Sequence, residues 1–553
     1  MFLKSRIPVE HRSLLRNSAS TYFAQFAAHW LCALFLLTGT GLAGAPPPAS
    51  AVIAAGTPIS QLRGWWVDSF HRGMRSPGEV AALVQDARRA HINALFVQMR
   101  RRGDALYATD LAPKAAGIPV EFDPLAALIE AAHQGSPRVE VHAWIVAMPI
   151  WDTGTRGHPP TNHLFETHTD WLTQSYTGQA EDGHSYYLDP GHPGVQEHLT
   201  RIVADLLRRY DVDGLQLDYI RYSGNQWGYN PVVLNRFKRL TGRNDRPAPE
   251  DAVWSQFRRD QVTALVRRIY LNALETRPQA RISAATICFS PAGKTNVDWP
   301  KSAAFSDKFQ DWRGWLQEGI LDLAVPMAYF TEPQLHSSWE AWERFARLNR
   351  FDRQIAMGLG AYLNSPSATV EQINSALRSE RSATGLDGVV LFSYAVPGQA
   401  GLQRQTLSEF LTRKGSGPDS GPFRGTARVP GMPWKQRPTT GHILGRITLA
   451  ETRTGLDGAV VQLTGPVNRR LVTDANGWYG AVDLPPGDYS VRVSQPGLEV
   501  RWTSISITKS VVAKLNVPIF RIPAARPKPP AAQPSSPVGP SQRRVNPQTG
   551  TRR

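Results

Sequence analysis

Between residues 60 and 400, short apolar runs alternate with segments in which apolar residues recur at helical spacing. The helical segment after Ser76-Pro77-Gly78-Glu79 is typical: this capping box precedes an apolar face made by Val80, Leu83, Val84 and Ala87. Asp123-Pro124 and Pro193 open two further predicted helices. Apolar runs that predict strands lie at 64–68, 92–97, 139–146, 214–218, 282–289, 321–327, 355–360 and 388–393.

These eight strands alternate with helices, which predicts a parallel sheet of the α/β class. Eight β–α units favour a closed (β/α)8 TIM barrel over a doubly wound sheet. The first strand is not followed by a glycine-rich phosphate loop, which also argues against a nucleotide-binding sheet. We therefore predict a TIM barrel over residues 60–412.

The pattern changes after residue 440, where short alternating strands are separated by turns at 474–477 and 484–489. This predicts a small all-β sandwich, transthyretin-like or immunoglobulin-like, over residues 440–520. Residues 413–439 are rich in Gly, Pro and Arg and predict a linker. Residues 521–553 are Pro-rich and basic, which predicts a disordered tail.

The first 45 residues have the layout of a signal peptide or an uncleaved anchor. A basic, polar start is followed by an apolar run over 26–45 that ends in Ala43-Gly44-Ala45, and three prolines open a short linker over 46–59. We expect an exported protein that is periplasmic, cell-wall-associated or secreted. Contact with a membrane is expected only through this segment, if it is not cleaved.

Composition narrows the chemistry further. The net charge of +16 is concentrated near the two ends of the chain, and the signatures of common nucleic-acid-binding modules do not occur, so we expect no nucleic-acid partner. The two cysteines, Cys32 and Cys288, cannot build a disulfide framework or a cysteine-based zinc site. Cys288 is expected to be a small buried residue, and no cofactor is expected.

In a TIM barrel the reacting groups come from the carboxyl ends of the strands and the loops that follow. Asp218 is the most suggestive residue, because it ends an otherwise apolar strand. Asp68 and Asp189 occupy comparable positions. The candidate substrate-binding residues are Arg100, Asp104, His142, Trp144, Arg221, Tyr222, Tyr329 and Tyr394. Carboxylates among aromatic and polar side chains suit sugars, and glycoside cleavage requires two carboxylates.

Structural interpretations of the same residues remain open. Asp218 could cap a helix or pair with Arg221, and Asp189 could belong to a helix-start turn. His142 could be a core residue, and Trp65 and Trp66 could serve packing. A metal site made by His142, Asp68 and Asp218 is supported by no spacing motif, so we expect no metal.

Residues 63–394 resemble the glycosyl-hydrolase-like 10 family. The resemblance is carried by residues 63–70, 96–104, 141–144, 170–172, 187–193, 210–222, 310–312, 324–330 and 358–364. It implies a barrel in a mostly exported, bacterial family thought to act on glycans, one relative of which acts on peptidoglycan glycan strands stripped of peptides. Thr473 to Gly477 and Leu484 to Tyr489 likewise resemble carboxypeptidase regulatory-like domains, which are stabilising or binding appendages.

One departure from the family pattern concerns the end of the fourth strand. Many members place two acids in a row there, whereas this chain has Tyr219 after Asp218. The partner carboxylate could be Asp68, Asp189 or Asp311. A separation of ~5 Å between the pair implies retention, and ~6.5–9.5 Å implies inversion.

Three hypotheses follow. The leading one is an exported glycoside hydrolase that acts on a bacterial polysaccharide, with peptidoglycan glycan strands as a candidate and Asp218 as nucleophile or base. The second is a non-catalytic carbohydrate-binding or cell-wall-binding protein on the same barrel. The third is a wall scaffold whose function lies in the sandwich and the tail.

Overall fold

The computed structural model describes residues 59–155, 158–289, 296–378, 385–398, 404–415 and 420–522, together with the single residues 539 and 546. The expected signal or anchor segment with Cys32, the linker over 46–58 and nearly all of the C-terminal tail lie outside the described residues. The described chain contains a barrel and a β-sandwich.

Eight parallel strands close into a barrel in the order β1-β10-β9-β8-β7-β6-β3-β2, which confirms the predicted fold class. They are β1 (Leu62–Val67), β2 (Ala94–Arg100), β3 (Glu140–Val146), β6 (Gly214–Asp218), β7 (Arg281–Thr286), β8 (Leu323–Ala328), β9 (Gln354–Gly360) and β10 (Gly388–Phe392). Each lies within a few residues of a predicted strand. Because every pair is parallel, all carboxyl ends open at one end of the barrel, which we call the mouth.

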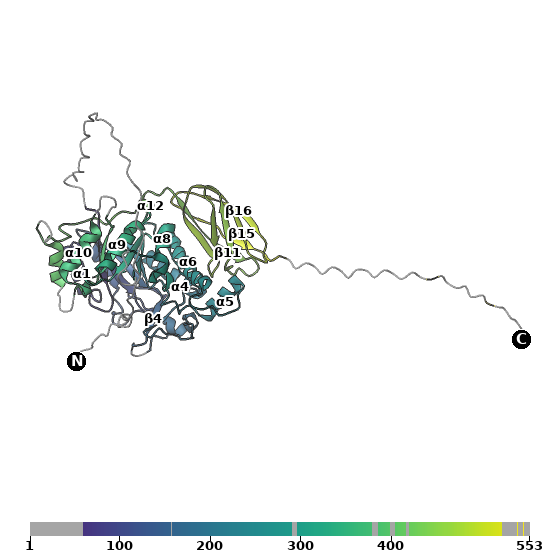
Figure 1. Ribbon diagram of the computed structural model, residues 1–553, viewed down its shortest axis with the longest axis horizontal. Helices are drawn as coiled ribbons and strands as arrows, with labels where there is room; N and C mark the ends of the chain where they lie inside the picture. Colours follow the sequence, from purple (N-terminus) through teal and green to yellow (C-terminus); the bar gives the residue numbers. More distant parts are fainter. Residues whose placement is uncertain are drawn as a thin grey trace, which may run out of the picture. The chain divides into compact units, whose positions relative to one another are not determined.

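Helices follow the strands and surround them (Figure 1). The principal ones are α1 (Pro77–Arg89), α2 (Pro124–His133), α4 (Pro193–Arg209), α5 (Pro231–Thr241), α6 (Ala252–Thr276), α8 (Trp312–Glu318), α9 (His336–Leu348), α10 (Pro366–Leu377) and α11 (Arg404–Thr412). Ser76 caps α1 as predicted, but the Glu79 carboxylate accepts the amides of Gly73 and Arg75 rather than completing the box. Asp123 caps α2, and Pro193 opens α4.

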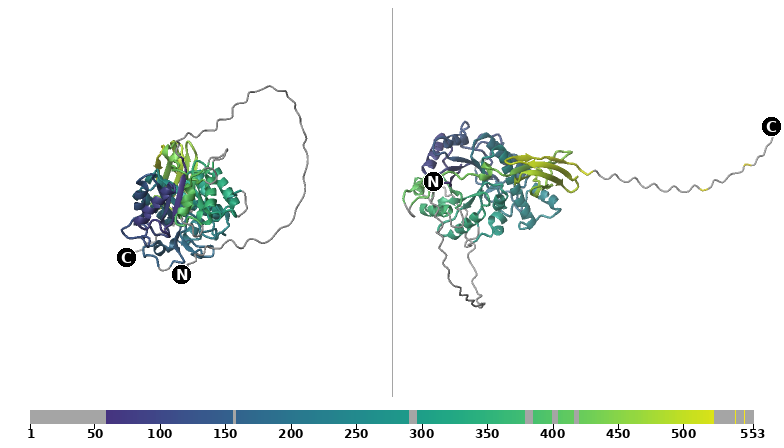
Figure 2. Two further views of the ribbon diagram at one scale, coloured as in Figure 1. Left: turned by 90° about the vertical axis from the view of Figure 1, so that its left-hand side faces the viewer. Right: turned by 90° about the horizontal axis from the view of Figure 1, so that it is seen from above.

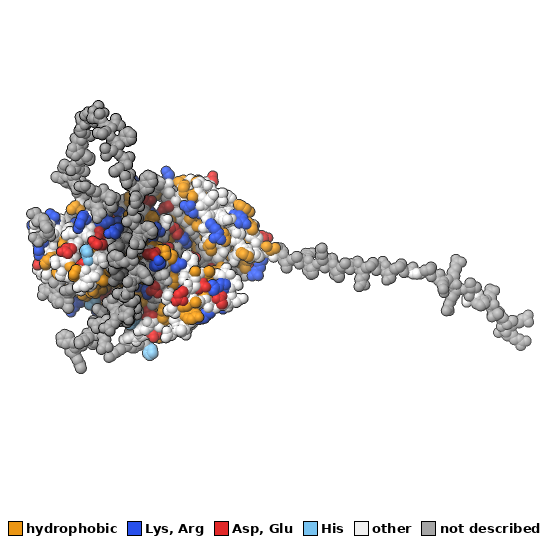
Figure 3. Space-filling view, in the orientation of Figure 1, with side chains coloured by type: hydrophobic (Ala, Val, Ile, Leu, Met, Phe, Trp, Pro, Cys, Tyr) orange, Lys and Arg blue, Asp and Glu red, His pale blue; other side chains and the backbone are white. Residues whose placement is uncertain are grey.

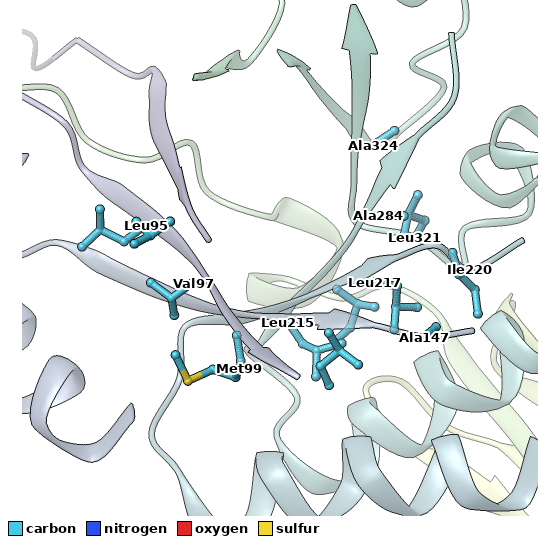
Figure 4. Packing of buried hydrophobic residues seen from close by; sticks show 14 of the residues in the cluster. Leu95, Val97, Met99, Ala147, Leu215, Leu217, Ile220, Ala284, Leu321 and Ala324 are labelled. Carbon is cyan, nitrogen blue, oxygen red and sulfur yellow. The ribbon is translucent and has the colours of Figure 1, made fainter. Parts of the chain in front are cut away.

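Side chains of the barrel strands point alternately outward and inward, so the strands contribute to two separate apolar cores. Outward-facing residues such as Leu95 and Val97 of β2 and Leu215 and Leu217 of β6 pack beneath the helices (Figure 4). The residues between them face inward and fill the barrel with a second cluster, which includes Trp66, Phe96, Trp144, Val325 and Val390. The barrel interior is therefore packed with apolar side chains around a few buried polar ones, such as His142 and Gln216.

Short elements interrupt the repeat on the mouth side. The segment between β3 and α4 holds the hairpin of β4 (Pro149–Asp152) and β5 (Ser185–Tyr187), together with α3 (Leu164–Thr167) and the 3-10 turn Thr169–Trp171. The loop after β7 holds the turn Trp299–Lys301 and α7 (Ala303–Ser306), and the turn Ala361–Leu363 follows β9. The β4–β5 hairpin was not predicted.

Residues 420–437, which we expected to belong to a linker, pack across the amino-terminal end of the barrel. Phe423 is fully buried beneath the Arg63 guanidinium, 4.5 Å from its ring centroid, and Arg428 exchanges backbone hydrogen bonds with the residues that precede β1. The short helix α12 (Pro433–Gln436) inserts Lys435 against Asp322, and both side chains are buried. We call residues 420–437 the strap.

The C-terminal strands form a two-layered sandwich with its own apolar core (Figure 2), which confirms the predicted β-domain. One sheet joins β11 (Gly441–Leu449) to β14 (Trp478–Leu484), β17 (Val512–Lys514) and β18 (Val517–Ile519). The other has the order β13 (Arg469–Val472), β12 (Val460–Thr464), β15 (Gly487–Ser494), β16 (Arg501–Ile507). The predicted turn at 474–477 is present, with the Gly477 amide donating to the Asp474 carbonyl.

The sandwich and the barrel share buried contacts. Leu444 and Val482 of the sandwich belong to the same apolar cluster as the barrel residue Leu271. The Arg236 guanidinium of α5 donates two hydrogen bonds, of 2.9 and 2.8 Å, to the Asp457 carboxylate, and both residues are buried. The described residues between 59 and 522 accordingly belong to one compact unit.

On the surface shown in Figure 3, basic and acidic side chains of the described residues are interspersed. No helix among the described segments is long and apolar enough to cross a membrane.

Candidate active site

The mouth brings together polar residues from opposite sides of the barrel. Asp68 follows β1, Asp218 ends β6 and Tyr329 follows β8. Trp144 of β3 faces the interior beside Asp218. Strand direction places these groups at one end, although Asp68 and Tyr329 are far apart in the sequence. This juxtaposition was predicted from the strand-end rule.

Asp218 is held firmly and is almost fully buried. One carboxylate oxygen accepts the backbone amide of Tyr219 at 2.7 Å, and the other accepts the Trp144 indole N–H at 3.1 Å. An Arg221 nitrogen lies 3.9 Å from the carboxylate. Burial raises the pKa of Asp218, and the neighbouring guanidinium and the two hydrogen bonds oppose that rise. Asp218 thus pairs with Arg221, as one structural interpretation of the sequence suggested. The paired carboxylate still lies at the mouth.

Aromatic side chains line the mouth beside this carboxylate. The Tyr329 ring lies 6.3 Å from Trp66, 5.7 Å from Phe392 and 6.1 Å from Tyr362, measured between centroids. Burial, together with the charge of Asp218, raises the pKa of Tyr329, so its hydroxyl stays protonated at neutral pH. These faces suit the apolar C–H surface of a sugar ring.

Tyr219, the residue that replaces the second acid of many family members, has a left-handed backbone, with φ at 50°. The Arg221 guanidinium lies over its ring, 4.1 Å from the centroid, and the ring of Tyr187 from β5 is 6.4 Å away. Tyr219 therefore contributes an aromatic ring where many family members have a carboxylate. The ring also contacts the Arg221 guanidinium, which supplies a cation to the site.

Asp68 is also buried, and its two oxygens differ. Oδ1 accepts the amides of Phe70 and His71 at 3.0 and 3.1 Å and lies 2.7 Å from the His71 ring nitrogen. Oδ2 lies 3.5 Å from the Ser393 hydroxyl, which follows β10. Of the three partner candidates, Asp68 is thus the one that directly follows a barrel strand and leaves one oxygen loosely held.

Asp189 and Asp311 have structural partners instead. Asp189 is fully buried and accepts hydrogen bonds from the Gly191 amide, the Thr173 hydroxyl and the Tyr222 hydroxyl. Burial raises its pKa. The Asp311 side chain caps α8 by accepting the Gly314 amide at 3.0 Å.

Three of the candidate substrate-binding residues are engaged away from Asp218. Arg100 is fully buried and donates to the carbonyls of Val146 and Ala147. Asp104 accepts a hydrogen bond from Arg101 at 2.9 Å. Tyr394 donates to Asp86 of α1 at 2.9 Å, on the outer side of the barrel.

His142 faces the barrel interior one layer below Trp144. Its Nε2 lies 3.0 Å from Glu140, and its ring packs 4.5 Å from Phe96. The structure therefore brings Trp144, Arg221 and Tyr329 to Asp218, places Tyr222 behind the site on Asp189, and leaves His142 in the core. Among the described residues, no group of three or more His, Cys, Asp or Glu side chains is arranged to hold a metal ion.

The strand-end rule also selects Tyr187, Tyr219 and Tyr362, which lie at or directly after β5, β6 and β9. Phe392, the last residue of β10, was not predicted, although the same rule could have selected it. Asp152 of β4 is different. It pairs with Arg102 and accepts the Ser185 hydroxyl at 2.7 Å, contacts that depend on the hairpin that we did not predict.

The described geometry agrees with a sequence match over residues 61–362, more than half of the chain, to glycosyl hydrolase-like 10. The chain belongs to the glycosyl hydrolase-like 10 family. Residues 442–519 match the carboxypeptidase regulatory-like domain, which agrees with the sandwich. Both resemblances stated from the sequence are thereby confirmed.

Relatives share this barrel region at low identity. Glycosyl hydrolase DigH of Escherichia coli strain K12 is 24% identical over 332 residues, covering 52% of this chain and 69% of that protein. Glycosyl hydrolase YngK of Bacillus subtilis strain 168 is 25% identical over 273 residues, covering 46% of this chain and 49% of that protein. The match to YngK thus spans only about half of its length.

Among solved structures, the glycoside hydrolase domain of PgaB (BpsB) from Bordetella bronchiseptica aligns with a TM-score of 0.48 at 14% identity. The alignment covers 64% of this chain and all of that domain.

Proposed function

We propose that this protein is an exported glycoside hydrolase that cleaves a bacterial polysaccharide, with peptidoglycan glycan strands as the first candidate. The observation that carries the proposal is the Asp218 carboxyl at the barrel mouth, buried beside Trp144, Tyr219, Arg221 and Tyr329. Membership of the family supports the reaction class. Export is proposed from the layout of residues 1–45 alone.

The proposed mechanism uses Asp218 as one of the two carboxyl groups that glycoside cleavage requires. As a carboxylate, it would attack the anomeric carbon or deprotonate a water molecule. Its raised pKa also suits donation of a proton to the leaving oxygen. Asp68 is our choice of partner, since its Oδ2 is loosely held and its backbone lies at the end of β1. Arg221 would orient the sugar or balance the charge that develops.

The test compares the wild-type protein with Asp218→Asn on peptidoglycan glycan strands from which an amidase has removed the peptides. Mass spectrometry of soluble products should show sugar fragments for the wild type and at least a thousandfold fewer for the variant, the scale expected when an essential catalytic group is lost. Equal release of fragments by the two proteins would refute the role of Asp218.

A second candidate function is carbohydrate binding without cleavage. One observation favours it: among the described residues that contact the Asp218 side chain, none is a carboxylate, since its neighbours are an indole, an amide and a guanidinium. If the wild-type protein releases no fragments but sediments with the strands, this candidate replaces the first.

A further inference from the structure

The outer face of the β13-β12-β15-β16 sheet carries an unusual set of side chains for a solvent-facing surface. Inward residues such as Val461, Leu463 and Val491 fill the sandwich core. The outward positions hold mainly hydroxyl and basic side chains around one large aromatic residue, Trp502, whose side chain is 66% exposed. It is the most exposed aromatic residue among those that the structure describes.

Strand register places Trp502 at one end of a straight row. Trp502 of β16 is paired with Arg492 of β15, Arg492 with Gln462 of β12, and Gln462 with Arg470 of β13. Because neighbouring strands lie ~4.8 Å apart, the row is roughly 14 Å long. It is longer than a single sugar ring and matches an extended polymer better than a small molecule.

The middle of the row is already ordered. The Arg492 guanidinium donates to the Gln462 side-chain oxygen at 2.8 Å and lies 5.8 Å from the centroid of the Trp502 ring. Holding the guanidinium in this way reduces the entropy that a ligand must remove when it binds. A single exposed apolar residue needs no explanation by itself. An exposed indole beside a fixed guanidinium is a different arrangement, because it offers an apolar face and a cation to one ligand.

The charge of the face indicates what kind of polymer fits. Arg470 and Arg492 lie in the row, whereas the acid on this face, Asp488, is hydrogen-bonded by Ser506. Short hydroxyl side chains cover the adjoining positions, paired as Thr464 with Ser490 and Ser490 with Ser504. A membrane would require an apolar rim that these positions do not supply.

We propose that this face binds a glycan chain that carries carboxylate groups, with a sugar ring stacked on Trp502 and a carboxylate paired with Arg492 or Arg470. The identity of the polymer rests on the proposed function, since the same glycan would occupy the barrel mouth and the sandwich. The two sites share one compact unit, so holding the polymer at the sandwich raises its effective concentration at the mouth.

The experiment uses the full chain with Asp218→Asn, which prevents cleavage during the measurement. Its dissociation constant for soluble, peptide-free peptidoglycan strands is measured by isothermal titration calorimetry. Adding Trp502→Ala should weaken binding about tenfold or more, the effect of removing a central aromatic anchor. Trp502→Phe should restore most of the affinity. Leu348→Ala removes an even more exposed apolar side chain from α9 and should change nothing.

Two further measurements test the charge. Uncharged chitin oligosaccharides should bind more weakly than the carboxylate-bearing strands, and raising the salt concentration should reduce that preference. Unchanged affinity in Trp502→Ala, with an unchanged circular dichroism spectrum, would overturn the inference. So would tighter Trp502-dependent binding to anionic lipid vesicles or to DNA than to the strands.

The outcomes also separate this inference from the proposed function. If the wild-type protein cleaves no glycan but binds the strands through Trp502, the proposed function fails and the binding face stands. If the wild-type protein cleaves the strands and Trp502→Ala binds them as tightly as before, the enzyme stands and the binding face fails.

Discussion

At the scale of single residues, the charge next to Asp218 sets the pH at which the proposed site works. Burial raises the pKa of this carboxyl, and the Arg221 guanidinium 3.9 Å away opposes the rise. Replacing Arg221 by Gln removes the opposing charge, so the pKa of Asp218 should rise further. The limb of the kcat/KM–pH profile that reports Asp218 should therefore move to higher pH. This direction holds whether Asp218 acts as base or as acid.

The control for this prediction is Arg89→Gln, which removes a guanidinium from the exposed end of α1. It should leave the profile in place. A profile of Arg221→Gln that does not move, or that moves to lower pH, would mean that another group controls the limb.

Asp189 illustrates the opposite case, a carboxyl whose contacts are structural. It accepts hydrogen bonds from Thr173, Tyr222 and the Gly191 amide while fully buried. Asp189→Ala would leave these donors without an acceptor and should lower the free energy of unfolding by about 3 kcal/mol. Asp189→Asn keeps an oxygen acceptor and should cost less. Urea unfolding followed by tryptophan fluorescence measures both, and equal stability of the three proteins would contradict the assignment.

At the scale of elements, the sequence predicted what depends on local periodicity and did not predict what depends on distant packing. The eight barrel strands were found because their apolar runs are long and continuous. The β4–β5 hairpin was not found, since its strands have four and three residues and pair across more than thirty positions. The same limit applies to the site: Asp218 and Trp144 follow from strand position, whereas the contact of Asp152 with Arg102 does not.

The strap shows how composition can mislead. Residues 413–439 are rich in Gly, Pro and Arg, as linkers are, yet Phe423 and Lys435 within them are buried. Their burial depends on partners far away in the sequence, Arg63 for Phe423 and Asp322 for Lys435. A single sequence does not reveal such pairs.

The pair Lys435–Asp322 gives the element-scale prediction. Asp322 is fully buried and also accepts hydrogen bonds from Trp434, Tyr270 and the Ile282 amide. The Lys435 charge and these hydrogen bonds oppose the effect of burial and lower the pKa of Asp322. Lys435→Met would leave a buried carboxylate without its cation and should lower the free energy of unfolding by about 3–5 kcal/mol.

Chemical denaturation measures this loss. Lys301→Met removes an exposed lysine that pairs with Asp298 and should leave the unfolding midpoint unchanged. Equal unfolding midpoints for the two variants would show that the strap does not stabilise the amino-terminal end of the barrel.

At the scale of the whole molecule, the barrel and the sandwich stabilise each other through buried contacts. Leu444 and Val482 lie in the barrel's outer apolar cluster, and Asp457 receives the buried Arg236 guanidinium as well as Arg239. Contacts of this kind couple the unfolding of two domains. A sandwich held rigidly in this way would also keep a bound glycan at a constant distance from the mouth.

Differential scanning calorimetry of the full chain tests this coupling. The wild-type protein should unfold in one transition. Asp457→Ala leaves two arginines at the junction without their carboxylate, and the cost of about 3–5 kcal/mol should lower the midpoint or divide the transition in two. Glu451→Ala, an exposed site of the same sandwich, should preserve the single transition. Two transitions in the wild-type protein would show that barrel and sandwich unfold independently, and the sandwich would then act as a separate module beside the barrel.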